Sequence, residues 1–229
     1  MVRAMLRFMN IHRWLTVLSL GLGLVLVAGC GPHSVSVQQT SAFPEPLVEA
    51  LPTRIGLYFP PDFTAFTHHE KRPNRGGEWT ISLGEPQAQV FRTVLSAAFR
   101  ELRELSSEQA SPGLDAVIVP AVQEFQFALP ADTRSNVFEI WVKYDLSIRD
   151  TQGEEVGHWV FTAYGKTPTA FMKSSEEAIQ AATLVALRDA GASMIAGLER
   201  DSRIRELLGV PMERNSSAAP EPAASSQHP

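Results

Sequence analysis

The clearest structural signal in the chain is VFEIWVKYDLSIR, residues 137–149. Apolar and polar side chains alternate along it, and alternating side chains point to opposite faces of a β-strand. The apolar set is Phe138, Ile140, Val142, Tyr144, Leu146 and Ile148. The sequence therefore predicts a strand with one face in the core and one face turned away from it.

The segments on both sides of this strand extend it into a sheet. Residues 150–153, Asp-Thr-Gln-Gly, have the composition of a short hairpin turn, and residues 154–166 alternate again. Residues 115–129 are also typical of a strand, in which Pro120 indicates a bulge or an edge because proline cannot donate a ladder hydrogen bond. Together the three segments predict an antiparallel meander.

Two helices are expected around this meander. The first opens at Gly84-Glu85-Pro86 and is predicted to run to Leu105, because its apolar residues are spaced three and four apart. The second begins at the capping box of Ser174 and Glu177, runs to about Arg200 and has a stripe of small residues. Asp201-Ser202 begins a short last helix, over residues 203–208.

The predicted fold class is α+β, as a single domain over residues 54–210. Short strands at 54–59 and 78–83 precede the first long helix, and residues 60–77 between them are expected to be irregular. The main elements follow the order β-α-β-β-β-α. We expect an antiparallel or mixed sheet with the two long helices packed on one face.

The leader of the chain ends in LVAGC, residues 26–30, which contains the only cysteine. Arg3, Arg7 and Arg13 precede an apolar run, residues 14–27, that is shorter than the roughly 20 residues needed to cross a bilayer. This pattern predicts a lipoprotein signal peptide over residues 1–29, cleavage between Gly29 and Cys30, and lipidation of Cys30. The alternative is an uncleaved anchor with an incidental cysteine.

The resemblance to bacterial lipoproteins implies a diacylglyceryl group on the Cys30 thiol. Gly31, in a position where aspartate often retains such proteins at the inner membrane, favours the outer membrane and a domain facing the periplasm. Residues 30–53 are predicted to be a flexible tether, and residues 211–229, rich in Pro, Ala and Ser, a disordered tail.

The charge balance argues against nucleic acid as a partner. The chain has 20 Lys and Arg against 25 Asp and Glu, a net charge of −5, and loss of the leader arginines makes it more acidic still. Nucleic-acid phosphates require clustered Lys and Arg. After lipidation no cysteine is left for a disulfide or a thiolate metal site.

No catalytic motif is recognisable in the sequence. It has no His-Glu-x-x-His, Gly-x-Ser-x-Gly, Walker or Rossmann pattern. His68 and His69 are adjacent and would point to opposite sides of an extended chain, and the sequence identifies no carboxylate beside His158. We therefore predict that the protein is not an enzyme and has no metal site or cofactor.

Aromatic and basic residues gather between the first two short strands. They are Phe63, Phe66, His68, His69 and Arg72. They form a candidate surface for contact with a partner. The alternatives are a solvated loop or a strand that continues after Pro60-Pro61.

The chain resembles the YajG-type family of bacterial lipoproteins over about residues 51–208. The resemblance rests on LDAVIV at 114–119, the hairpin around Gly153, and DSRIRELL at 201–208. It implies an outer-membrane lipoprotein and identifies no functional residues. The layout is also similar to the curli secretion lipoprotein, the Pel polysaccharide export lipoprotein and activators of penicillin-binding proteins, which act by oligomerising or by contacting a partner.

These features lead to three expectations for function. The first is a non-catalytic accessory or scaffold of a cell-envelope assembly, with an envelope protein or a second copy as partner. The second is a binding module for a lipid, glycan or peptide, which predicts an apolar pocket between helices and sheet. The third is an envelope hydrolase, which would require a pocket that gathers His158 with a carboxylate.

Overall fold

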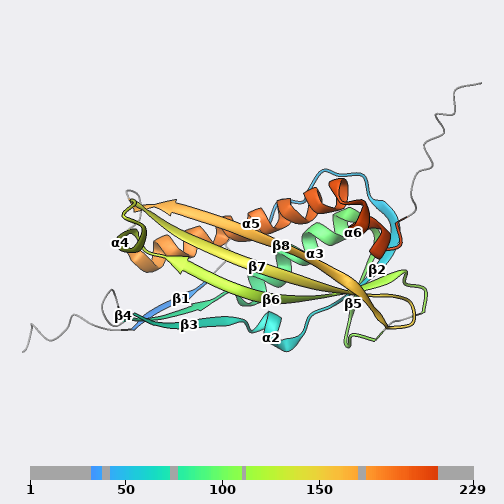
Figure 1. Ribbon diagram of the computed structural model, residues 1–229, viewed down its shortest axis with the longest axis horizontal. Coiled ribbons are helices and arrows are strands. Elements are labelled where there is room, and N and C mark those ends of the chain that lie inside the picture. Colours follow the sequence, from blue (N-terminus) through green and yellow to red (C-terminus); the bar gives the residue numbers. More distant parts are fainter. Residues whose placement is uncertain (1–31, 38–41, 73–76, 110–111, 170–173, 211–229) are drawn as a thin grey trace, which may run out of the picture.

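The predicted meander is present and forms most of a five-stranded sheet (Figure 1). β6 (Ala116–Ala128), β7 (Val137–Arg149) and β8 (Glu155–Pro168) pair antiparallel in sequence order. β2 (Leu51–Tyr58) and β5 (Phe99–Leu105) extend it by parallel pairing, giving the order β5-β2-β6-β7-β8. The fold is therefore α+β with a mixed sheet, as expected. The computed structural model describes residues 32–37, 42–72, 77–109, 112–169 and 174–210, so the predicted signal peptide, Cys30 and the tail at 211–229 lie outside the described residues.

The predicted faces of β7 are confirmed. Every second residue from Phe138 to Ile148 is buried, and the residues between them are half-buried on the opposite face. Pro120 lies just beyond Ile118, the last residue of β6 that pairs with β2, and a register shift follows between Val122 and Glu124. Both predicted consequences of Pro120, an edge and a bulge, are therefore found beside it.

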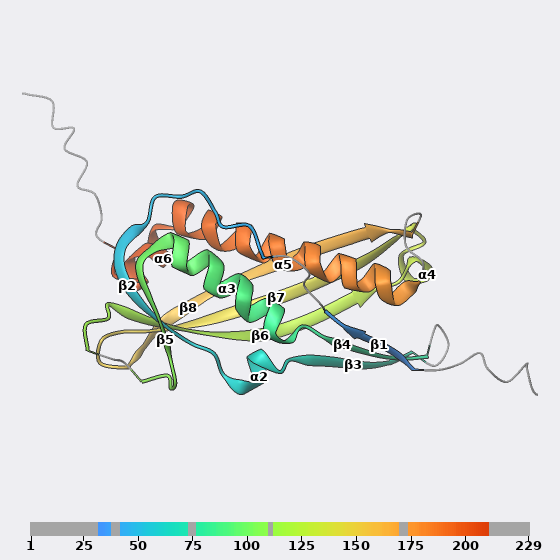
Figure 2. The same ribbon diagram turned by 180° about the vertical axis from the view of Figure 1, so that it is seen from behind.

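The two long helices, α3 (Gly84–Ala98) and α5 (Ser175–Arg200), lie on the same side of this sheet and contact each other (Figure 2). α5 packs mainly on β8 and also on β7. Its cap is as predicted, because the Ser174 hydroxyl accepts a hydrogen bond from the Glu177 backbone N–H at 3.1 Å. Its predicted stripe is buried along its whole length, at Ile179, Ala182, Ala186, Ala190, Met194 and Leu198.

The prediction of a helix reaching Leu105 is wrong at its C-terminal end. The helix ends at Ala98, and residues 99–105 form the edge strand β5 beside β2. Leu102 and Leu105 fit the helical spacing, but both lie half-buried on a strand, where Leu102 packs against the core. Parallel pairing with β2 overrides a local helix preference because backbone pairing and burial together outweigh intrinsic propensity.

The expectation of an irregular segment at 60–77 is also wrong. It contains α2 (Pro61–Thr64) and β3 (Thr67–Arg72), which pairs antiparallel with β4 (Gly77–Ser82). β1 (His33–Ser36) pairs parallel with β4 and completes a second sheet of order β1-β4-β3. This sheet packs on β6 through aromatic contacts, including Trp79 with Phe127 at 5.5 Å between ring centroids.

The prediction of a flexible tether over 30–53 is corrected by the same sheet. β1 lies within that range, and Val35, Val37 and Phe43 are buried against the core. Residues 33–36 form a strand by pairing with β4, a partner far along the chain that the local sequence does not reveal. Short helices α4 (Pro130–Thr133) and α6 (Ser202–Leu207) complete the fold; the Asp201 side chain caps α6, as expected.

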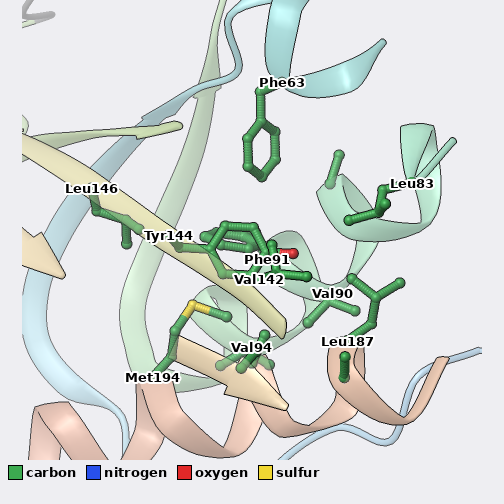
Figure 3. Packing of buried hydrophobic residues seen from close by; sticks show 14 of the residues in the cluster. Phe63, Leu83, Val90, Phe91, Val94, Val142, Tyr144, Leu146, Leu187 and Met194 are labelled. Carbon is green, nitrogen blue, oxygen red and sulfur yellow. The ribbon is translucent and has the colours of Figure 1, made fainter. Parts of the chain in front are cut away.

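Side chains fill the space between the helices and the large sheet. Figure 3 shows Phe63, Phe91, Tyr144 and Met194 converging there. Of these, Phe91, Tyr144 and Met194 have no solvent exposure, and the Phe91 and Tyr144 rings meet edge to face at 5.2 Å. A binding site must therefore be sought outside this core.

Candidate functional site

Four of the residues predicted to contact a partner pack within the fold: Phe63, Phe66, His68 and Arg72. His69 is exposed on β3, and its Nδ1 lies 3.1 Å from the Thr80 hydroxyl of β4. Phe63 is 2% exposed and lies against Phe59 and Phe91. Phe66 and His68 pack on Phe125, with the His68 ring 4.8 Å from it. These contacts stabilise the packing of the fold, which accounts for the residues without a partner. A role in partner contact stays a prediction.

Arg72 joins three elements of the fold. Its guanidinium donates to Glu70 on its own strand, to Asp132 of α4, and to the Phe127 carbonyl oxygen of β6 at 2.8 Å. It also lies 4.0 Å from the centroid of the Phe127 ring. The side chain is only 15% exposed, so solvent screens these contacts weakly.

We expect Arg72→Ala to lower the free energy of unfolding by about 2 kcal/mol, because hydrogen bonds to charged groups contribute about 1.5–3 kcal/mol. Arg72→Lys should recover only part of this loss, since one ammonium cannot reproduce the planar fork. Lys71→Ala is the matched control: its ion pair with Glu78 spans 3.6 Å and Lys71 is 78% exposed, so a change below about 0.5 kcal/mol is expected. Urea unfolding measures all three, and equal losses at 71 and 72 would contradict this role.

His158 lies in a polar cluster on the outer face of the β7–β8 hairpin. Its Nδ1 is 2.8 Å from Asp145 and its Nε2 is 3.1 Å from Glu155. Ser147 donates to Glu155 at 2.6 Å rather than to the imidazole. The imidazole is therefore not in contact with the serine hydroxyl, and the His158 side chain, 49% exposed, stands on an open strand surface.

The hydrogen bond that the imidazole donates to Asp145, followed by the charge of Asp145, raises the pKa of His158 above the ordinary value. Since the folded pKa is the higher one, the protonated imidazole stabilises the fold below the unfolded pKa of about 6.5, and this stabilisation is lost as pH rises through the folded pKa. An NMR titration of the ring should show the raised midpoint. Asp145→Asn should lower it toward the ordinary value, whereas Glu154→Gln, in the hairpin turn, should leave it unchanged.

Metal binding finds no support in the described ranges, where no group of three His, Cys, Asp or Glu side chains could hold an ion. The expectations that the protein has no metal site, no cofactor and no catalytic activity remain predictions.

An apolar cavity of about 390 Å³ lies on the outer side of the helices. Such a volume is within the range of small-molecule sites, about 300–1,000 Å³. The lining comes from α3, from α5 and from residues 42–50, which we call the strap: Phe43, Pro44, Pro46, Val90, Val94, Arg188, Gly191, Ala192, Ile195, Ala196 and Glu199. The prediction of an apolar pocket between the helices and the sheet is wrong, because side chains fill that space; this cavity lies on the other side of the helices.

A second cavity of about 330 Å³ continues from the first. Both are lined by Ile195 and Glu199, and the second extends to Leu198 of α5 and Arg205 of α6. The strap passes along both, on the outside of α3 and α5 (Figure 2). The two cavities form one groove, which we call the strap groove.

The strap is held by side-chain packing. None of its residues has a hydrogen bond anywhere in the described chain. Phe43 is buried, whereas Leu47 is fully exposed. A segment without backbone hydrogen bonds is the kind of structure that opens locally at low cost.

No protein-family model matches this sequence, and no curated protein matches it. Among solved structures, the chain is similar to a candidate lipoprotein from Caulobacter crescentus CB15, at 16% identity and a TM-score of 0.33 over 63% of this chain and 90% of that one. It is also similar to the hypothetical protein CT253 from Chlamydia trachomatis, at 9% identity and a TM-score of 0.37 over 64% and 96%. Lipoprotein GNA1162 from Neisseria meningitidis is 21% identical with a TM-score of 0.20, over 38% and 51%.

These likenesses are too distant to place the chain in a family. They include lipoproteins, but they transfer neither a site nor a partner. The class of protein defined by the structure itself is an α+β domain of two sheets, with a strap groove on the outer side of its helices.

Proposed function

We propose that the protein is an outer-membrane lipoprotein that faces the periplasm and serves a cell-envelope assembly as a non-catalytic accessory or scaffold. The observation that carries this proposal is the leader ending in LVAGC at residues 26–30. Each buried lipid methylene contributes about 0.8 kcal/mol, so two or more acyl chains hold a protein on a bilayer almost permanently. β1 begins at His33, so the attachment point lies three residues from the folded domain.

The outer face of the large sheet supports a scaffold role. Trp141 and Tyr164 are paired across β7 and β8 with ring centroids 5.4 Å apart. They adjoin a shallow hollow of about 200 Å³ whose lining includes Trp141, Lys143 and Glu124. Val160 on the same face is 47% exposed. Trp141 and Tyr164 are half-buried on this face, and Trp and Tyr are enriched at protein interfaces, so this face is a better candidate for partner contact than residues 63–72.

Two measurements in cells test the proposal. Cys30→Ser should abolish lipidation and remove the protein from the outer-membrane fraction; unchanged sedimentation would refute the anchor. A photocrosslinking residue at Lys143 should capture an envelope protein or a second copy, whereas one at Ser96, on α3, should capture much less. Equal or absent capture at the two positions would refute the scaffold surface.

A second function, a ligand-binding module, is favoured by one observation: the first cavity of the strap groove is apolar and of ligand size. This function does not depend on the outer sheet face, so the two can be tested separately.

A further inference from the structure

The strap groove is long and narrow. Its floor follows α5 from Arg188 to Glu199, and at a rise of 1.5 Å per residue these positions are about 16 Å apart along the helix. Gly191, Ala192 and Ala196 line this floor with small side chains, and Ile195 is the one large apolar residue of α5 among them. Such a shape suits an unbranched chain that lies parallel to α5.

The lining excludes ligands with many polar groups. Of the residues around the first cavity, only Arg188 and Glu199 are charged, and the remainder are Phe, Pro, Val, Ile, Ala and Gly. A peptide would bring backbone N–H and C=O groups into this lining without partners, which is costly. A glycan would leave its hydroxyl groups equally unpaired. An aliphatic chain has no such groups to satisfy.

The two charged residues of the first cavity determine which end of it suits an anionic group of a ligand. Arg188 is exposed and has no hydrogen bond or ion pair with any described residue. A guanidinium binds a carboxylate through two parallel hydrogen bonds. Glu199, at the far end of the first cavity, would repel an anion, and the second cavity adds Glu49 beside Arg205, so we place the carboxylate at the Arg188 end.

Movement of the strap would let a ligand enter the groove. The strap has no hydrogen bond to break when it moves. Pro44 and Pro46 restrict its backbone to extended conformations, so its conformational entropy changes little on opening. β1 and β2 on either side of it are anchored in different sheets. The strap can therefore lift from α3 and α5 while both sheets stay intact.

We propose that the strap groove binds a long-chain fatty acid, with its alkyl chain along α5 beneath the strap and its carboxylate on Arg188. This inference rests on the ligand-binding function above and specifies its ligand. It is independent of the scaffold surface on β7 and β8.

The test uses the lipidated full-length protein in phosphatidylcholine nanodiscs. A palmitate analogue with a photoreactive group on its alkyl chain is added, and the crosslinked peptides are mapped by mass spectrometry. We expect crosslinks in the strap and in residues 188–199, competed by palmitate two to five times better than by methyl palmitate. Crosslinks elsewhere, or none, would overturn the proposal.

Matched variants on α5 sharpen this result. Ala192→Phe fills the groove floor and should weaken palmitate binding at least tenfold, whereas Val185→Phe, exposed on the same helix but outside the groove, should not weaken it. Arg188→Gln should remove the preference for palmitate over its methyl ester. If both probes bind the groove equally in the native protein, the fatty-acid assignment fails while the ligand-binding function stands; if Ala192→Phe and Val185→Phe bind alike, both fail.

Discussion

Gly165→Ala is expected to lower the free energy of unfolding by roughly 3 kcal/mol or more, a large loss for one added methyl group. A Cβ at this position of β8 would lie 2.1 Å from the Ala182 carbonyl oxygen and 2.4 Å from the Ala186 backbone nitrogen. Both atoms belong to the backbone of α5 and cannot rotate away. The whole helix must shift, which opens the buried contacts of its small-residue stripe.

Gly157→Ala is the matched control on the same strand. Its Cβ would meet the side-chain tip of Leu207 at 2.9 Å, and a leucine tip can move to another rotamer. We expect a loss below about 1 kcal/mol there. Thermal and urea unfolding of both variants should show the contrast, and similar losses at 157 and 165 would mean that α5 is not held as closely as described.

This contact also explains how α5 differs from a membrane helix. By length and composition α5 could cross a bilayer, the one such helix in the described ranges. Its small residues instead let it approach β8 until the backbones touch at Gly165. Composition alone does not distinguish a helix in a bilayer from a helix in a protein core, whereas the buried stripe of α5 does.

Regular alternation and local capping made most of the fold predictable. The burial of β7 and the caps at Ser174 and Asp201 depend on residues close together in sequence, and each was found as predicted. β5 and β1 depend on partners far along the chain. Their local patterns suit a helix and a tether, so only the tertiary pairing reveals them as strands.

The candidate sites were less predictable, for a related reason. The contact between His158 and Asp145 could have been found from the hairpin register, because Asp145 pairs with Val160 and Ser147 with His158. The strap groove could not, because it requires residues near 45, near 92 and near 192 to meet. Nothing in the spacing of these residues links the three segments.

The second large effect is expected at Gln87, which is fully buried on α3. Its amide accepts a hydrogen bond from the Tyr144 hydroxyl at 3.3 Å and donates one to the Phe63 carbonyl oxygen. Gln87→Leu would leave the buried Tyr144 hydroxyl without a partner, and it would remove one of the donors to the Phe63 carbonyl oxygen, which keeps the Phe66 N–H at 3.4 Å. An unsatisfied buried group costs about 1–3 kcal/mol and a lost hydrogen bond about 1 kcal/mol, so we expect a loss of about 3 kcal/mol in the free energy of unfolding.

A double-mutant cycle separates this polar contact from packing. Tyr144→Phe removes the hydroxyl and should cost only about 1 kcal/mol. Once the hydroxyl is gone, Gln87→Leu should be less damaging by about 1 kcal/mol, because only the hydrogen bond to the Phe63 carbonyl oxygen is then lost. Burial raises the pKa of Tyr144 above its ordinary value, so the hydroxyl remains a donor throughout the working pH range.

Gln126→Leu, at an exposed position of β6, is the control and should change stability by less than about 0.5 kcal/mol. Strict additivity of the two core changes would show that Tyr144 and Gln87 are not energetically coupled, and that packing alone joins α3 to β7 at this point.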